Sequence, residues 1–418
     1  MIGGLEYKLW IAGKVVSDHF YTLIETITVE QGIDLATEAR LELVIFANDQ
    51  GKWGGPTDPH AMTWKRLRLE IRNQTSTWVP LIDGPIVTWD ASMSGEPGQS
   101  TITIIARDDT AYLNVCAKPA VFEDKTDEAV IRKLFEKADS ITCVKIDRIP
   151  DLPADRPLKH IKRGTEIDMI RAIADPYDLH VYVVPDTLNT SIAYVKRLAT
   201  TDTSGLPVFV LTGSDRNVET FQARNDVAKA SRYQGQQQNI DDPGAAPPNP
   251  IVSKFTADDG MPPLTTKPNP YDTTSLDSKP NPYGDSSTGS KPNPYGEPVT
   301  LIDKSSALDS LANLGTEIIS PFVSAFRDVG ELIQRWQQRS SYTITATGSV
   351  RYGCYDGVLR AYDLVGVSGA NAKLCTNFIV REVTHTLSRS EYRQDFTLMT
   401  NATRTVTKGA GAVPTNVF

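Results

Sequence analysis

The chain has 418 residues, and 40% of them are hydrophobic and 22% charged, which is typical of a folded globular protein with several domains. Its net charge is -8, and its 43 basic residues form no block, so we expect no sequence-specific binding of nucleic acid. The start lacks the pattern of a secretion signal and no apolar run is long enough to cross a bilayer, so we expect no membrane anchoring.

The first hundred residues alternate between apolar and polar positions, which predicts β-strands. The runs are LIETITVE, LELVIF and TITIIAR, and glycine-rich segments between them predict turns. In LIETITVE we expect Ile24, Thr26, Thr28 and Glu30 on one face, with Leu23, Ile27 and Val29 on the other. Only Glu25 does not fit this alternation. A sheet of this length with one apolar face is expected to curl, which predicts a first β-barrel over residues 1–118.

The spacing of apolar residues changes after this segment. Thr126 can cap a helix through DEAVIRKLFEKA, where apolar residues recur at helical spacing. Thr165 is expected to start a second helix that Pro176 ends, and the strand-like LHVYVVPD follows. Residues 119–205 are therefore predicted to form a small α/β module.

The composition of residues 236–302 predicts an insertion without a core, because Pro, Ser and Asn dominate it. The word KPNPY occurs three times there, and its prolines favour short extended rods. The simpler interpretation is a tether between domains. The alternative is that Tyr271, Tyr283 and Tyr295 are interaction residues that dock onto a neighbouring subunit.

Residues 303–339 show helical periodicity, which Pro321 is expected to divide into two helices. The apolar seam of this segment consists of Leu308, Leu311, Ile318, Phe322, Val329, Leu332 and Trp336. One interpretation is a helix hairpin packed on its own domain, and the other is a seam through which copies of the chain associate.

Strand patterns resume from Tyr342 with YTITATG, LVGVSG, FIVREVTHTLS and YRQDFTLMT. In the last of these, Tyr392, Phe396 and Leu398 share one apolar face. Together with FVLT at 209–212, these strands predict a second β-barrel from residues 206–235 and 340–407, followed by a flexible tail at 408–418. The predicted fold class is mainly β (α+β): two β-barrels, a small α/β module, and a disordered-looking Pro-rich insertion with helices.

The sequence has no pattern of catalytic or metal-binding residues. The cysteines Cys116, Cys143, Cys354 and Cys375 form no C-x-x-C pair, so we expect buried free thiols rather than a zinc site or disulfides. The five histidines are scattered, and no phosphate-binding or nucleophile motif occurs. We therefore predict a protein that is not an enzyme, with no catalytic residue, no metal and no cofactor.

Residues 357–400, GVLRAYDLVGVSGANAKLCTNFIVREVTHTLSRSEYRQDFTLMT, resemble the closing domain of the late-control D family of phage tail proteins. Leu359, Arg360 and Asp363 match the family's Leu-Arg-Pro-Gly-Asp turn, with Ala361 and Tyr362 in place of Pro-Gly. The other matching elements are Val367 to Gly369, Phe378 to Val383, and His385. Upstream, RGTEIDMIRAIADPYDLHVYV, KTDEAVIRKLFEKA and the opening strands are also similar, so only residues 236 to about 340 fall outside the resemblance.

The resemblance implies a structural baseplate hub, related to the hub part of type VI secretion spike proteins. Such a hub is a homotrimer whose subunits each have two tube-protein-like β-barrels. It is a symmetry adaptor that joins a trimeric spike to the hexameric tail tube of a contractile phage tail or contractile injection system. The implied partners are further copies of the chain, a separate spike protein, the first tail-tube ring and baseplate wedge proteins. DNA or a cargo protein would only pass through the lumen. The resemblance implies assembly in the bacterial cytoplasm and residence in the virion tail baseplate or injection particle.

Two other functions are compatible with a β-rich chain. A receptor- or carbohydrate-binding tail protein would use exposed aromatic residues, such as Trp53 and Trp64 in GKWGGPTDPHAMTW. A tail-associated peptidoglycan hydrolase is less compatible, because it would need paired carboxylates or a metal cluster and no such spacing occurs.

Overall fold

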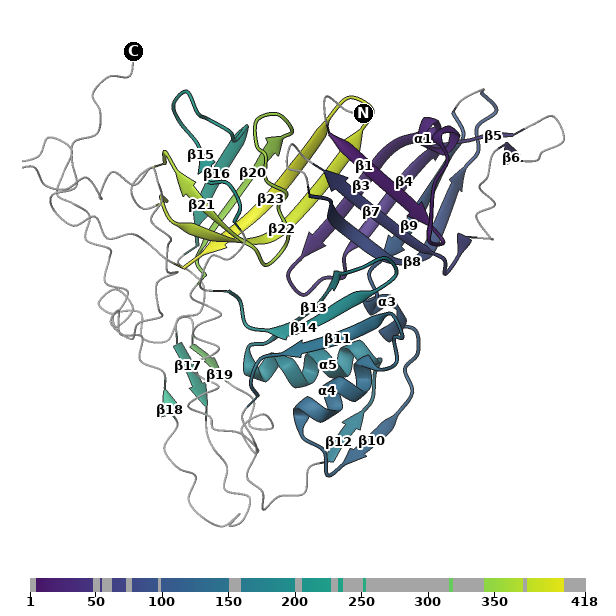
Figure 1. Ribbon diagram of the computed structural model, residues 1–418. Helices are drawn as coiled ribbons and strands as arrows, with labels where there is room; N and C mark the ends of the chain where they lie inside the picture. The colour runs from purple at the N-terminus through teal and green to yellow at the C-terminus, as the bar shows by residue number, and fades with distance from the viewer. Residues whose placement is uncertain are drawn as a thin grey trace, which may run out of the picture.

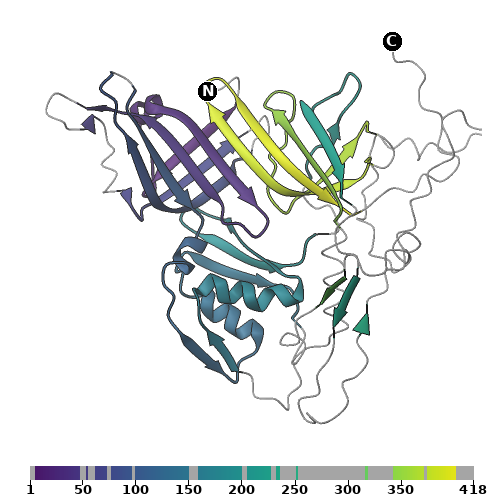
Figure 2. The same cartoon turned by 180° about the vertical axis from the view of Figure 1, so that it is seen from behind.

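The computed structural model describes residues 5–47, 53–54, 62–72, 77–96, 99–149, 159–199, 205–226, 232–235, 251–252, 316–318, 342–370 and 374–401. Figure 1 shows strands in most of the described chain, with two β units side by side and a smaller part with helices next to them. The view from behind in Figure 2 shows the same arrangement. The prediction of a mainly β (α+β) fold is therefore confirmed.

One sheet of thirteen strands runs through both β units. The first β unit contributes β1 (Glu6–Ile11), β2 (Lys14–Val15), β3 (Ile24–Gly32), β4 (Glu38–Val44), β7 (Arg66–Arg72), β8 (Val79–Ser92) and β9 (Thr101–Arg107). The second β unit contributes β15 (Phe209–Val210), β16 (Thr220–Asn225), β20 (Ile344–Arg351), β21 (Leu364–Ser368), β22 (Asn377–Ser388) and β23 (Tyr392–Thr400). The two units are joined because β22 pairs with β3, antiparallel. The sequence did not indicate this continuity.

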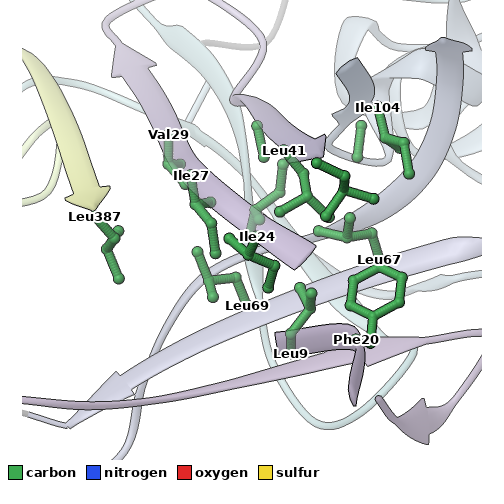
Figure 3. Packing of buried hydrophobic residues seen from close by; sticks show 14 of the residues in the cluster. Leu9, Phe20, Ile24, Ile27, Val29, Leu41, Leu67, Leu69, Ile104 and Leu387 are labelled. Carbon is green, nitrogen blue, oxygen red and sulfur yellow. The ribbon is translucent and has the colours of Figure 1, made fainter. Parts of the chain in front are cut away.

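The first β unit folds over a core of its own. Leu9 of β1 and Ile27 of β3 lie in the same buried cluster, although their strands are at opposite ends of the unit's strand order (Figure 3). The sheet turns at β8, whose residues 79–85 pair with β7 and whose residues 86–92 pair with β9. Gly84 stands at this corner, where an added Cβ would lie 1.8 Å from the carbonyl oxygen of Arg107. Only glycine allows so close an approach of two backbones.

At the start of β3 the structure differs from the prediction for Ile24. A short helix that the sequence did not predict, α1 (Asp18–Leu23), precedes the strand, and the Ser17 side chain caps it. A β-bulge between Ile24 and Thr26 then shifts the alternation by one residue. Ile24 is therefore buried with Ile27, and the prediction that it lies on the polar face is wrong. The same bulge explains why Glu25 did not fit the pattern.

The α/β module follows the first β unit in the chain. Its elements are α3 (Thr110–Leu113), β10 (Ala120–Glu123), α4 (Asp127–Phe135), β11 (Ile141–Ile146), β12 (Lys159–Lys162), α5 (Glu166–Ala174), the 3-10 helix η1 (Asp175–Tyr177), β13 (His180–Pro185) and β14 (Ser191–Lys196). The helices α4 and α5 share a core with the sheet β11-β14-β13. Thr126 and Thr165 cap these helices, as the sequence predicted.

The second β unit repeats the strand order of the first. The order in the first unit is β3-β4-β9-β8-β7-β1, and in the second it is β16-β20-β23-β22-β21-β15. Taken in chain order, each of these six strands has a counterpart in the same position of the other unit, and only β2 of the first unit has none. The two differ at one end, where β1 pairs antiparallel with β7 but β15 pairs parallel with β21. Phe209 of β15 stacks on Phe396 of β23 with ring centroids 4.8 Å apart, so this sheet also folds over its own core.

The insertion lies in a loop that is short in the first unit. Between β3 and β4 the first unit has only residues 33–37, whereas the counterpart strands β16 and β20 are separated by the chain from Asp226 to Thr343. Within it, β17 (Arg232–Gly235), β18 (Ile251–Val252) and β19 (Thr316–Ile318) form a three-stranded sheet. The helix prediction for 303–339 is therefore wrong at Thr316–Ile318, where β19 pairs with β17. Two further short strands, β5 (Phe46–Ala47) and β6 (Trp53–Gly54), pair with each other, antiparallel.

Candidate assembly surfaces

Eight strands form a continuous layer across both units, in the order β16-β20-β23-β22-β3-β4-β9-β8. One face of this layer, the polar face, carries hydroxyl and charged side chains, because apolar residues alternate onto the other face. A row of directly opposed residues crosses all but the last strand: Thr220, Ser349, Asp395, Thr384, Glu30, Glu38 and Arg107. A hollow on the second unit is lined by polar residues of the same face, including Gln222, Thr347 and Glu382.

Several charges on the polar face pair with one another. Glu38 binds Arg40 and Arg107, each at 2.9 Å, and Arg393 binds Asp395 at 2.7 Å. Such exposed pairs add little stability. They do keep the face from becoming a patch of one sign, so it offers a phosphate backbone no concentrated positive charge.

The layer ends in two open edges. β16 pairs only with β20, and beyond Ile86 the second edge of β8 pairs with no strand that the structure describes. The N–H groups along β16 point alternately toward β20 and away from it. The Asp226 N–H donates to the Thr343 carbonyl at 2.9 Å, which shows which of these groups face β20. The N–H groups of Phe221, Ala223 and Asn225 consequently point away from β20. Exposed edges of this kind are templates for pairing with another chain.

Side chains reinforce the junction between the two units. Arg360 of the second unit donates to the Pro80 carbonyl at 3.3 Å, and burial lowers the pKa of its guanidinium. The Tyr362 hydroxyl accepts a hydrogen bond from the Asp34 N–H at 2.8 Å, and burial raises the pKa of this tyrosine. Tyr362 also stacks on Tyr182 of the α/β module, so it contacts all three parts of the chain.

A buried ion network attaches the module to the first unit. Asp83 binds Arg66 at 2.8 Å and Arg68 at 2.9 Å, and it accepts the Asn189 N–H at 2.9 Å. Arg68 also donates to two carbonyls of the β13–β14 turn, those of Asp186 and Thr187. Since Asp83 is fully buried, its interactions with both arginines are only weakly screened.

Other titratable residues have structural contacts in the described chain. His160 lies 3.3 Å from Asp127, whose carboxylate accepts the Tyr177 hydroxyl, and buried His385 contacts the Tyr392 hydroxyl at 2.8 Å. Within the described ranges no three His, Cys, Asp or Glu residues are grouped to hold a metal, and no helix is long and apolar enough to span a membrane. All four cysteines are free. Three of them are exposed and Cys375 is half-buried, so the prediction of buried thiols is wrong.

Most interaction residues predicted from the sequence lie outside the described residues. These are Tyr271, Tyr283 and Tyr295, and all of the apolar seam except Ile318, which lies in β19. Sequence reasoning missed the two open edges, because an alternating pattern does not reveal which strands will be neighbours. The junction residue Tyr362 did have a signal, since a tyrosine stands where the resembling family has glycine.

No family model and no curated protein sequence matches the chain, whereas its fold resembles solved structures. The 43 kDa tail protein of prophage MuSo2 from Shewanella oneidensis is 13% identical with a TM-score of 0.61, covering 94% of this chain and 98% of that one. The tail protein from Neisseria meningitidis MC58 is 16% identical with a TM-score of 0.58, covering 95% and 97%. A chain of the Francisella PdpA-VgrG complex is 10% identical with a TM-score of 0.55, covering 97% and 54%. The chain therefore has the fold of phage tail proteins, as the resemblance implied.

Proposed function

We propose that the protein is a structural hub of a phage-tail or injection-system baseplate, and that it acts as a homotrimeric adaptor between threefold and sixfold symmetry. The observation that carries this proposal is the common strand order of the two β units. A spike of three chains offers three equivalent contacts, whereas a ring of six subunits offers six. Three copies of a chain with two similar units would offer three whole chains to the spike and six similar units to the ring.

The junction within the chain supports a ring of this kind. There β22 of the second unit pairs with β3 of the first. The counterparts of β22 and β3 are β8 and β16, which form the two open edges of the layer. Repeating the same junction between chains would pair β8 of one copy with β16 of the next. Three copies would then close the layer into a ring of six β units without an open edge.

The remaining parts of the chain would occur three times in such a ring. The α/β module and the insertion would face a separate threefold spike, while the six β units would face the first tail-tube ring. Baseplate wedge proteins would bind the outside. The solved PdpA-VgrG complex, whose chain shares the fold, makes a spike partner reasonable.

The polar face is suited to line the lumen of the ring. Its hydroxyl groups and locally paired charges would let DNA or a cargo protein pass without strong attraction. In this proposal the protein catalyses no reaction and needs no cofactor. The competing carbohydrate-binding function would rest on exposed Trp64, and a glycan array that gave no binding would remove it.

Light scattering of the purified chain tests the proposal, with a trimer expected and a strict monomer at micromolar concentration contradicting it. The matched variants are Ala223→Pro and Val15→Pro. Both positions are on edge strands with the N–H directed away from the neighbouring strand, so proline is tolerated there. Ala223→Pro should give folded monomers because it blocks pairing with β8, whereas Val15→Pro should leave the trimer intact. Equal trimer content in both variants would exclude the pairing of β16 with β8.

A further inference from the structure

Trp64 and Tyr362 occupy equivalent positions in the two β units. The Trp64 N–H donates to the Ile86 carbonyl at 2.8 Å, and the Ile86 N–H donates back to Lys65. The Tyr362 N–H donates to the Val380 carbonyl at 3.0 Å, and the Val380 N–H donates back to Asp363. In the first unit this pair of bonds lies at the bend of β8, just before β7 begins. In the second unit it lies at the bend of β22, just before β21 begins.

The two residues also share an unusual backbone conformation. Trp64 has a φ of 64° and Tyr362 a φ of 75°. Bulky residues rarely adopt this left-handed region, and such strain persists only where surrounding contacts hold it. Each aromatic ring stacks on a tyrosine: Tyr362 on Tyr182 with centroids 3.8 Å apart, and Trp64 on Tyr112 with centroids 5.7 Å apart. The equivalence therefore extends from the backbone to the contacts of the side chains.

The two positions differ in what covers them. Tyr362 is mostly buried, because the turn after β3 lies on it and the Asp34 N–H donates to its hydroxyl. Trp64 is 48% exposed. The counterpart of Trp64 is covered by a neighbouring unit, whereas Trp64 itself is exposed and has a strained backbone. This combination is typical of an interface residue whose partner is missing.

We propose that Trp64 is a contact between copies of this chain, and that it is covered by the end of β16, at Asn225 and Asp226, of the adjacent copy. This inference rests on the proposed trimer. Within the chain, β22 and β3 pair antiparallel, so Glu382 at the bend of β22 faces Gly32 at the end of β3. The counterpart of Glu382 is Thr88, because each follows the bulge of its strand. The same arrangement between chains therefore places the end of the neighbour's β16, at Asn225, next to Thr88 and near Ile86, whose carbonyl accepts the Trp64 N–H.

This geometry identifies the occupant as well as the surface. Within the chain, the turn that covers Tyr362 directly follows the end of β3. The corresponding place in the second unit is the end of β16. The end of β16 of the next copy around the ring would therefore cover each Trp64.

Two measurements on the full chain test this inference. Trp64→Ala should raise the concentration at which trimers dissociate by at least about tenfold, since interface tryptophans are frequent hot spots. The matched control is Trp78→Ala, which removes a tryptophan that packs against Lys8 and Arg72 of the same chain. That control should leave the dissociation concentration unchanged. Trimers of Trp64→Ala as stable as the parent would overturn the inference.

The second measurement identifies the occupant directly. A photoreactive benzoylphenylalanine in place of Trp64 should give products of twice the chain mass on a denaturing gel, with the cross-link at the end of β16, near Asn225 and Asp226. Cross-links only within one chain, or to another segment, would overturn the inference even when light scattering finds a trimer. A parent chain that stays monomeric would instead refute the proposed function and this contact together.

Discussion

The ring of Tyr362 lies against the ring of Tyr182, with centroids 3.8 Å apart and an angle of 17° between their planes. Its hydroxyl accepts the Asp34 N–H at the same time. One side chain of the second β unit therefore holds the α/β module and the first β unit. These contacts offset the cost of its left-handed backbone, which the glycine of the resembling family would not incur.

Three variants of Tyr362 separate these contributions. Tyr362→Phe removes only the hydroxyl that accepts the Asp34 N–H, so the free energy of unfolding should fall by about 1 kcal/mol. Tyr362→Ala and Tyr362→Gly both remove the ring, but only glycine relieves the backbone. The glycine variant should therefore be more stable than the alanine variant by about 1 kcal/mol. Urea unfolding measures both differences, and equal stability of these two variants would show that the positive φ costs nothing here.

The ion network at Asp83 should be sensitive to the loss of one partner. Asp83→Asn removes one of the two carboxylates that each arginine binds, since Arg66 also pairs with Asp109 and Arg68 with Glu70. We therefore expect a loss of about 2 kcal/mol in the free energy of unfolding, the cost of a charged hydrogen bond. Glu128→Gln is the matched control, because it removes a carboxylate from an exposed pair with Arg132. That change should cost less than about 0.5 kcal/mol. Similar losses in the two variants would mean that Asp83 does not stabilise the contact with the module.

Alternating and helical patterns predicted the elements of the fold well. Tyr392, Phe396 and Leu398 are buried on one face of β23 as expected, and Thr126 and Thr165 start the helices that were assigned to them. These features depend on neighbours within a few residues, so the local sequence contains the information. The pairing of FVLT with the C-terminal strands is also confirmed, since β15 pairs with β21.

Features that depend on contacts distant in the sequence were not predicted. The bulge at Ile24 depends on which strand pairs with β3, and the union of the two sheets depends on one pairing between β22 and β3. The interaction residues chosen from the sequence came from the insertion. The proposals rest instead on the open edges of β8 and β16 and on the exposed Trp64. These surfaces can be recognised only once the strand order is known. How the chain divides into independently folding domains stays a prediction.

His385 should make stability depend on pH. It is fully buried, and burial lowers its pKa to about 3, with a further contribution from the positive charge of Arg360. An unfolded histidine titrates near about 6.5, so its contribution to stability is complete above that pH and is lost as the pH falls toward 3. The loss is about 1.4 kcal/mol for each pH unit in that window.

The matched variant is His385→Asn, whose amide can still contact the Tyr392 hydroxyl but does not titrate. Its free energy of unfolding should fall less steeply than that of the parent between about pH 6 and pH 4. Urea unfolding across this window gives the two slopes. Parallel curves would show that His385 is protonated in the folded protein.

Removing residues 265–298 should leave the described fold intact. The insertion stands in a loop whose counterpart in the first unit is only residues 33–37, so the flanking strands do not need its length to pair. The entropy of closing a long loop changes only with the logarithm of its length, and the expected change in the free energy of unfolding is below about 1 kcal/mol. Thermal unfolding of the variant and the parent measures this, and a large loss of stability would mean that the insertion packs on the fold.

The same deletion separates the two interpretations of Tyr271, Tyr283 and Tyr295. If they dock onto a neighbouring baseplate or spike subunit, the variant should still form trimers, because β8, β16 and Trp64 are retained, but it should assemble fewer complete particles. Repeated weak contacts add through avidity, so substitution of all three tyrosines by alanine should reproduce the defect and substitution of one should have a smaller effect. Complete particles of normal activity from the deletion variant would identify the repeats as a tether.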